Sequence, residues 1–160
     1  MILSVLLTLW GIFLLFVILL MIYHVNKKSC QTHMFEDWNQ VDIPYITIDV
    51  QGHPFNMIVD SGGAVSMITA NALKMLDYDE SKRQINIEGI TAEVIPNSTV
   101  TIPFTINGRE IKEDFVVHHT DDFANFNKLY GITIHGLLGN ELFDKTHCKI
   151  DYKTHTVTFY

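Results

Sequence analysis

A single aspartate that follows a short apolar run is the first residue in the chain with clear catalytic potential. Residues 57–59 (MIV) lead into Asp60, Ser61, Gly62 and Gly63, and a second β-type run (AVSMIT) follows. A carboxylate at a strand end can act as a general acid or base, two glycines permit a tight turn, and the Ser61 hydroxyl can form hydrogen bonds that hold the loop. The same four residues also fit an ordinary turn, in which Asp60 accepts hydrogen bonds from backbone amides.

The elements around this loop are predicted to be short β-strands separated by turn residues, so the domain is expected to be mainly β. The pair Asn107 and Gly108 is typical of a hairpin turn. A short helix is expected over residues 70–76, with Thr69 as its N-cap, and a helical turn near Asn140. The predicted strands cover residues 45–50, 55–59, 84–90, 100–106, 110–117, 149–151 and 156–160.

A second stretch, far from the first in sequence, points to the same kind of site. Residues 135–143 (HGLLGNELF) hold an apolar pair between glycines and then a predicted short helix, and residues 149–159 (KIDYKTHTVTF) hold a predicted strand pair. Together with the loop at Asp60, and in this order, they resemble the two signatures of the retropepsin-like aspartic proteases over about residues 43–160. The resemblance implies a closed, retropepsin-like β-barrel with one or two short helices.

The resemblance also implies roles for individual residues. Asp60 is the expected catalytic residue, and Ser61, Gly62 and Gly63 are expected to shape and support its loop. The other residues that it implies are Leu137 and Leu138, packed under the loop, and Glu88, Gly89 and Ile90, in the flap.

Two features depart from the family pattern. After the Asp-Ser/Thr-Gly triplet the family usually has alanine and often a hydroxyl residue next, whereas this chain has Gly63 and Ala64. Gly63 adds backbone freedom, and Ala64 removes a potential hydrogen bond near the site. The corresponding flap hairpin, residues 87–98 (IEGITAEVIPNS), holds a single glycine where the family's flap is glycine-rich. The alternative function is therefore a non-catalytic module that binds an extended peptide by strand addition.

Peptide hydrolysis by this chemistry requires two carboxylates that share one proton and hold one water molecule. The chain holds one Asp-Ser-Gly triplet, and the 134 residues after residue 26 are too few for a two-lobed arrangement. We therefore expect a homodimer in which each subunit contributes Asp60 at the two-fold axis. The expected substrate is a peptide or protein.

Other kinds of chemistry are disfavoured by composition. The net charge is −7, so a nucleic-acid partner is not expected. Residues 118–130 (HHTDDFANFNKLY) lack a period and predict a surface loop. Its adjacent His118 and His119 would point to opposite faces of a strand, so they fit solvated loop residues better than one metal site. No metal and no cofactor are expected.

The N-terminal region is predicted to be a membrane anchor. Residues 2–23 are apolar apart from Ser4, Thr8 and Gly11, which is enough to cross a bilayer as a helix. A cleaved signal peptide is the rival interpretation, but a basic start and a small-residue cleavage site are missing. Lys27 and Lys28 follow the run, which favours a cytoplasmic C-terminal domain. The expected organisation is an anchor (1–26), a juxtamembrane linker (27–42) and the protease domain (43–160).

Overall fold

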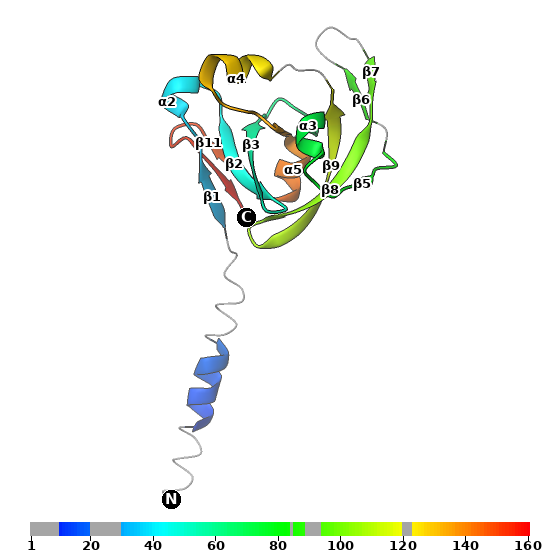
Figure 1. Cartoon of the computed structure of the whole chain (residues 1–160). Coiled ribbons are helices and arrows are strands. Elements are labelled where there is room, and N and C mark those ends of the chain that lie inside the picture. The colour runs from blue at the N-terminus through cyan, green and yellow to red at the C-terminus, as the bar shows by residue number, and fades with distance from the viewer. Residues whose placement is uncertain (1–9, 20–29, 84, 89–93, 120–122) are drawn as a thin grey trace, which may run out of the picture.

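The computed structural model describes residues 10–19, 30–83, 85–88, 94–119 and 123–160 of the chain (Figure 1). Its centre is one seven-stranded sheet that curls on itself, and the largest hydrophobic cluster lies against this sheet. The strands, in spatial order, are β2 (Tyr45–Val50), β3 (His53–Val59), β10 (Gly136–Leu138), β4 (Ser66–Thr69), β9 (Arg109–His118), β8 (Thr99–Ile106) and β5 (Asp79–Glu80).

Alternation of side chains gives this sheet one buried face. In β3 the buried positions are Phe55, Met57 and Val59, two residues apart, as expected when successive side chains point to opposite faces. Curling brings the β2–β3 turn to β8, where the Gln51 side chain donates a hydrogen bond to the Pro103 carbonyl at 3.1 Å. The mainly β class is confirmed. The sheet is a curled half-barrel with β2 and β5 as its edges, rather than the closed barrel that was expected.

Strand β10 lies between β3 and β4, the two strands that the Asp60 loop connects. It pairs parallel to β3, with Leu138 opposite Val59, and antiparallel to β4, with Gly136 opposite Ile68. The chain therefore returns after a long excursion to fill the space beneath its own loop.

A separate three-stranded sheet joins the two ends of the described domain. Strand β1 (Gln31–Met34) pairs antiparallel with β12 (Thr156–Phe159), which also pairs with β11 (Lys149–Asp151). Phe35 is buried, and its N–H donates to the His155 carbonyl at 2.8 Å. From Gln31 onward, the stretch expected to be a linker is thus part of the folded domain.

Four short helices complete the domain: α2 (Trp38–Val41), α3 (Ala70–Leu73), α4 (Ala124–Tyr130) and α5 (Asn140–Lys145). The predicted cap of α3 is confirmed, because Thr69 Oγ1 accepts a hydrogen bond from the Ala72 N–H at 3.2 Å. Helix α4 corrects the prediction of a loop over residues 118–130. Phe123 and Phe126 pack against a small cluster formed by Val41, Tyr45 and Ile134, which supplies the tertiary support that the local sequence does not reveal.

The hairpin at Asn107 and Gly108 was predicted from its turn residues, and the flap hairpin was expected from the family resemblance. Strands β8 and β9 meet at Asn107 and Gly108, whose φ angles of 56° and 68° are the left-handed values that a two-residue hairpin turn requires. Strand β6 (Ile85–Glu88) pairs with β7 (Val94–Asn97) in the region expected to be the flap. Gly89 and Ile90, two of the predicted flap residues, lie outside the described residues, and Glu88 ends β6.

The predicted anchor is described only over residues 10–19, which are helical. Large apolar side chains between Trp10 and Leu19 are 45–69% exposed in this helix. The rest of the predicted span lies outside the described residues. Within the described parts of the chain, no helix reaches the length and hydropathy of a membrane span.

Candidate active site

Asp60 lies directly after the last residue of β3 and is partly exposed. Its N–H donates to the Leu138 carbonyl at 3.0 Å, which extends the β3–β10 pairing by one step. Its Oδ1 accepts the Gly62 N–H at 2.9 Å, and its carbonyl accepts the Gly63 N–H at 3.2 Å. The backbone position and one carboxylate oxygen of Asp60 are thus fixed by neighbouring amides.

The rest of the loop is tied to the first turn of helix α5. The Asn140 N–H donates to the Gly63 carbonyl at 2.8 Å, and the Glu141 N–H donates to the Ala64 carbonyl at 3.1 Å. The Asn140 side-chain amide donates to the Ser61 carbonyl at 2.9 Å. The two backbone bonds use N–H groups at a helix start that have no partner within the helix. The loop and the helix start therefore satisfy each other's polar groups.

Glycines make this close approach feasible. A Cβ on Gly63 would lie 3.0 Å from Asp60 Oδ2, so an alanine here would require the carboxylate to shift by a few tenths of an ångström. A Cβ on Gly139 would lie 2.5 Å from the Val65 carbonyl carbon, and one on Gly136 would lie 2.2 Å from the Met67 carbonyl oxygen. Strand β10 and the start of α5 can pack under the loop only because both positions lack a side chain.

The structure brings together the predicted residues at Asp60 and on β10. Ser61 and Gly62 are exposed and Gly63 is partly buried, all in the turn after Asp60. Leu138 is fully buried beneath the loop, and Leu137, its neighbour on β10, is partly exposed. Glu88 lies on the separate β6–β7 hairpin.

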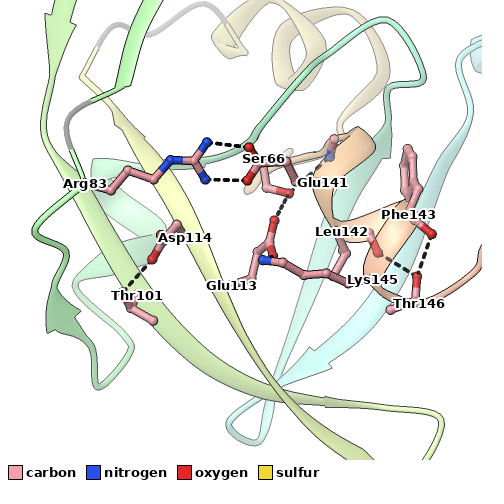
Figure 2. Close-up of polar contacts among 11 residues, drawn as sticks. Ser66, Arg83, Thr101, Glu113, Asp114, Glu141, Leu142, Phe143, Lys145 and Thr146 are labelled. Carbon is pink, nitrogen blue, oxygen red and sulfur yellow. Dashed lines mark hydrogen bonds and ion pairs between the residues drawn. The ribbon is translucent and has the colours of Figure 1, made fainter.

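Sequence reasoning missed a buried carboxylate near the loop, shown in Figure 2. The Glu113 side chain is 0% exposed, and its Oε1 accepts the Ser66 hydroxyl at 3.1 Å. Its Oε2 lies 2.5 Å from Lys145 Nζ. Burial raises the pKa of Glu113, and Lys145 opposes this change. A signal was present, since Glu113 stands two and four residues before Phe115 and Val117 and therefore shares their buried face.

A second ion pair connects α5 to the segment before the flap hairpin. Arg83, close to the start of β6, forms a two-pronged pair with Glu141, with N–O distances of 2.6 and 2.5 Å (Figure 2). The hydrogen bonds from Arg83 lower the pKa of Glu141. The Glu141 N–H also donates to the Ala64 carbonyl in the Asp60 loop. Glu141 therefore contacts both this loop and Arg83, close to the start of β6.

Known proteins share the fold of this chain and a family pattern within it. Among curated protein sequences, none matches the chain. Similar solved structures include the EIAV protease complexed with the inhibitor HBY-793 (15% identity, TM-score 0.50, covering 71% of this chain and 96% of that one). They also include a retropepsin-like aspartic protease from Rickettsia conorii (17%, 0.48, 81% and 88%) and the retroviral protease-like domain of Ddi1 from Leishmania major (15%, 0.46, 73% and 87%).

The first of these structures supports a shared retropepsin-like fold. The family model described as Aspartyl protease matches residues 46–142, which is more than half of the chain and includes the Asp60 loop, β10 and the start of α5. The chain therefore belongs to the aspartyl protease family.

Proposed function

We propose that the protein is an aspartic endopeptidase in which Asp60 of one subunit and Asp60 of its partner activate one water molecule. The observation that carries the proposal is the placement of Asp60 at a strand end, in a loop held by amides from β10 and α5. In such a pair one carboxylate acts as base on the water, and the other acts as acid toward the peptide. Two carboxylates about 3 Å apart cannot both ionise, so the pair shares one proton.

The homodimer follows from the number of catalytic loops. One chain carries one Asp-Ser-Gly triplet, while the reaction needs two carboxylates. A symmetric dimer supplies the second at the axis. Activity should therefore rise faster than linearly with protein concentration until the dimer saturates. Strict proportionality over a range in which light scattering detects only monomer would contradict the shared site.

The decisive test is Asp60→Asn in the full chain, assayed on a mixed peptide library. We expect cleavage to fall ~1,000-fold or more, because the amide keeps the volume but cannot accept or release the proton. Asp49→Asn is the matched control, since Asp49 Oδ1 also accepts a glycine N–H, that of Gly52 at 3.1 Å, in another turn. Full turnover by Asp60→Asn, with a wild-type unfolding profile, would refute the proposal.

The alternative, a module that binds peptides without cutting them, gives a different result in the same assay. Peptides would then be retained uncut by the wild-type protein, and Asp60→Asn would leave their affinity nearly unchanged. Cleavage by the wild-type protein that Asp60→Asn abolishes would exclude this alternative.

We also propose that residues 2–23 anchor the protease in a membrane, with the folded domain on the cytoplasmic side. The apolar run, the exposed apolar side chains of residues 10–19, and Lys27 and Lys28 after the run support this topology. Exposed Cys30 allows a test with a membrane-impermeant thiol reagent. Labelling should require permeabilised cells, and labelling of intact cells would place the domain outside.

Two features make the labelling specific to Cys30. Cys148 is half-buried, and burial raises the pKa of its thiol to about 11, so it reacts slowly. A Cys30→Ser variant measures any labelling that remains.

A further inference from the structure

The buried Glu113 carboxylate is bound by side chains from two elements that flank the Asp60 loop. A carboxylate without solvent contact is costly unless it is paired and hydrogen-bonded. Glu113 has both kinds of partner: Lys145 Nζ at 2.5 Å from Oε2, and the Ser66 hydroxyl at 3.1 Å from Oε1. Lys145 comes from α5 and Ser66 from β4, so the carboxylate joins two elements that flank the Asp60 loop.

Ser66 also binds the start of α5. Its Oγ accepts the Gly139 N–H at 3.1 Å while its single proton goes to Glu113. A hydroxyl has one proton and two lone pairs, so an acceptor at a fixed place sets the direction of the proton and leaves a lone pair for the amide. Without Glu113, the hydroxyl could rotate its proton toward Gly139 and lose this bond.

Gly139 connects this contact to the loop itself. It is the N-cap of α5, and the next two amides, of Asn140 and Glu141, donate to the Gly63 and Ala64 carbonyls. Gly139 has little freedom to move toward the loop, because even a Cβ added to it would lie 2.5 Å from the Val65 carbonyl oxygen. A shift of Gly139 must therefore displace the loop that carries Asp60.

We propose that Glu113 is a positioning residue for the aspartyl protease reaction, acting through Ser66 and Gly139 on the loop that carries Asp60. This inference rests on the proposed function. Figure 2 shows the arrangement, with Glu113 between Ser66 and Lys145 while its chain neighbour Asp114 turns to Thr101. Lys145 is 46% exposed and supplies the positive charge that keeps the carboxylate an acceptor.

The test compares variants of the full chain in steady-state peptide cleavage. We expect Ser66→Ala and Glu113→Leu each to lower kcat about 10- to 100-fold, since small misplacements of catalytic groups have effects of this size. KM should change less than about threefold if substrate contacts are intact. Glu113→Gln, which keeps an acceptor oxygen, should restore most of the rate. The double variant Glu113→Leu/Ser66→Ala should be no slower than the slower single variant, because both act through one contact.

Asp114→Asn is the matched control, because Asp114 is the next residue of β9 and bonds to Thr101 at 2.6 Å, away from Ser66. An equal loss in Asp114→Asn, or additive losses in the double variant, would overturn the proposal.

A second readout does not depend on activity. Amide hydrogen exchange at Asn140 and Glu141 should speed up in Ser66→Ala and Glu113→Leu, while the amides of β8 keep their wild-type protection. Unchanged exchange at both positions in a folded Ser66→Ala protein would overturn the proposal. If the wild-type chain cleaves no peptide, the proposed function fails on its own, and the exchange experiment still decides whether Glu113 and Ser66 hold the loop.

Discussion

The Asp60 loop and the α4 segment are both connections between strands of the same sheet, but they are held in opposite ways. The loop receives hydrogen bonds from Asn140 and Glu141 and donates one to Leu138, residues far from it in sequence. Helix α4 is closed by local bonds, such as the Gly131 N–H to the Asn127 carbonyl at 2.8 Å, and none of its residues is buried. The position of the loop is therefore set by backbone hydrogen bonds to distant elements, and that of α4 by local backbone bonds together with the packing of Phe123 and Phe126.

This difference makes the two regions unequal in their tolerance of change. A side chain added under the loop must displace backbone, whereas one added at the end of α4 meets solvent. Backbone strain, by contrast, should be the main cost at the end of α4, where the Gly131 N–H closes the last turn at a positive φ angle.

Gly136→Ala should be the most destabilising of these changes. Its Cβ would lie 2.2 Å from the Met67 carbonyl oxygen, so β10 and β4 would have to separate. Overpacking of this kind costs roughly 3 kcal/mol in the free energy of unfolding. Denaturant titration measures it, and a loss below that of Gly131→Ala would reverse the proposed contrast.

Gly131→Ala tests the backbone strain at the C-terminal end of α4. Gly131 ends α4 at φ 70°, and a Cβ added to it would have no atom within 4 Å, so the substitution adds only backbone strain. We expect a loss of about 1 kcal/mol in the free energy of unfolding. Because Asn tolerates left-handed backbone better, Gly131→Asn is the control and should recover part of the loss.

His135 lies where the α4 segment meets β10, and it should respond to pH. Burial lowers its pKa, and its Nδ1 accepts the Asn56 N–H at 3.0 Å while the ring stacks on Phe55. The unfolded chain therefore takes up a proton before the folded one does, and the stability due to neutral His135 is lost as pH falls below about 6.5.

The measurement is the pH dependence of the free energy of unfolding in the wild type and in His135→Gln. The variant should show a shallower decline between neutral and mildly acidic pH, even if it is less stable overall. His33, whose pKa is also lowered by burial, remains in both proteins and cancels from the comparison. Identical slopes would show that His135 is protonated equally in the folded and unfolded states.

Leu129→Ser should have the smallest effect on stability. Leu129 is 72% exposed on α4, so its removal should change the free energy of unfolding by no more than about 0.5 kcal/mol. Thermal unfolding at two protein concentrations checks this. A large, concentration-dependent drop would instead reveal that Leu129 is covered by another molecule in solution.

The sequence allowed β2, β3, β8, β9 and the Asp60 loop to be predicted because they depend on local patterns. Alternating apolar residues define β3 and β8, and Asn107 with Gly108 defines the hairpin turn at the end of β8. Strand β1 was missed because its residues QTHM are mostly exposed and become a strand only by pairing with β12.

The contact between Ser66 and Glu113 could not be predicted for a related reason. It depends on the parallel register of β4 and β9, in which Ser66 stands opposite Phe115. Two strands separated by such a long segment can adopt several registers that satisfy the same alternation. The Asp60 loop could thus be located from the sequence, whereas the contact between Ser66 and Glu113 could not.

The pairing of β1 with β12 also has a consequence for how the protein acquires its structure during synthesis. Thr32 and Thr158, whose hydroxyls lie 3.0 Å apart, are separated by 126 positions in the chain. Strand β1 therefore stays unpaired until β12 has been made and released from the ribosome, and such distant pairings slow folding. The three-stranded sheet should consequently form only once β12 is available to cover the edge of β1.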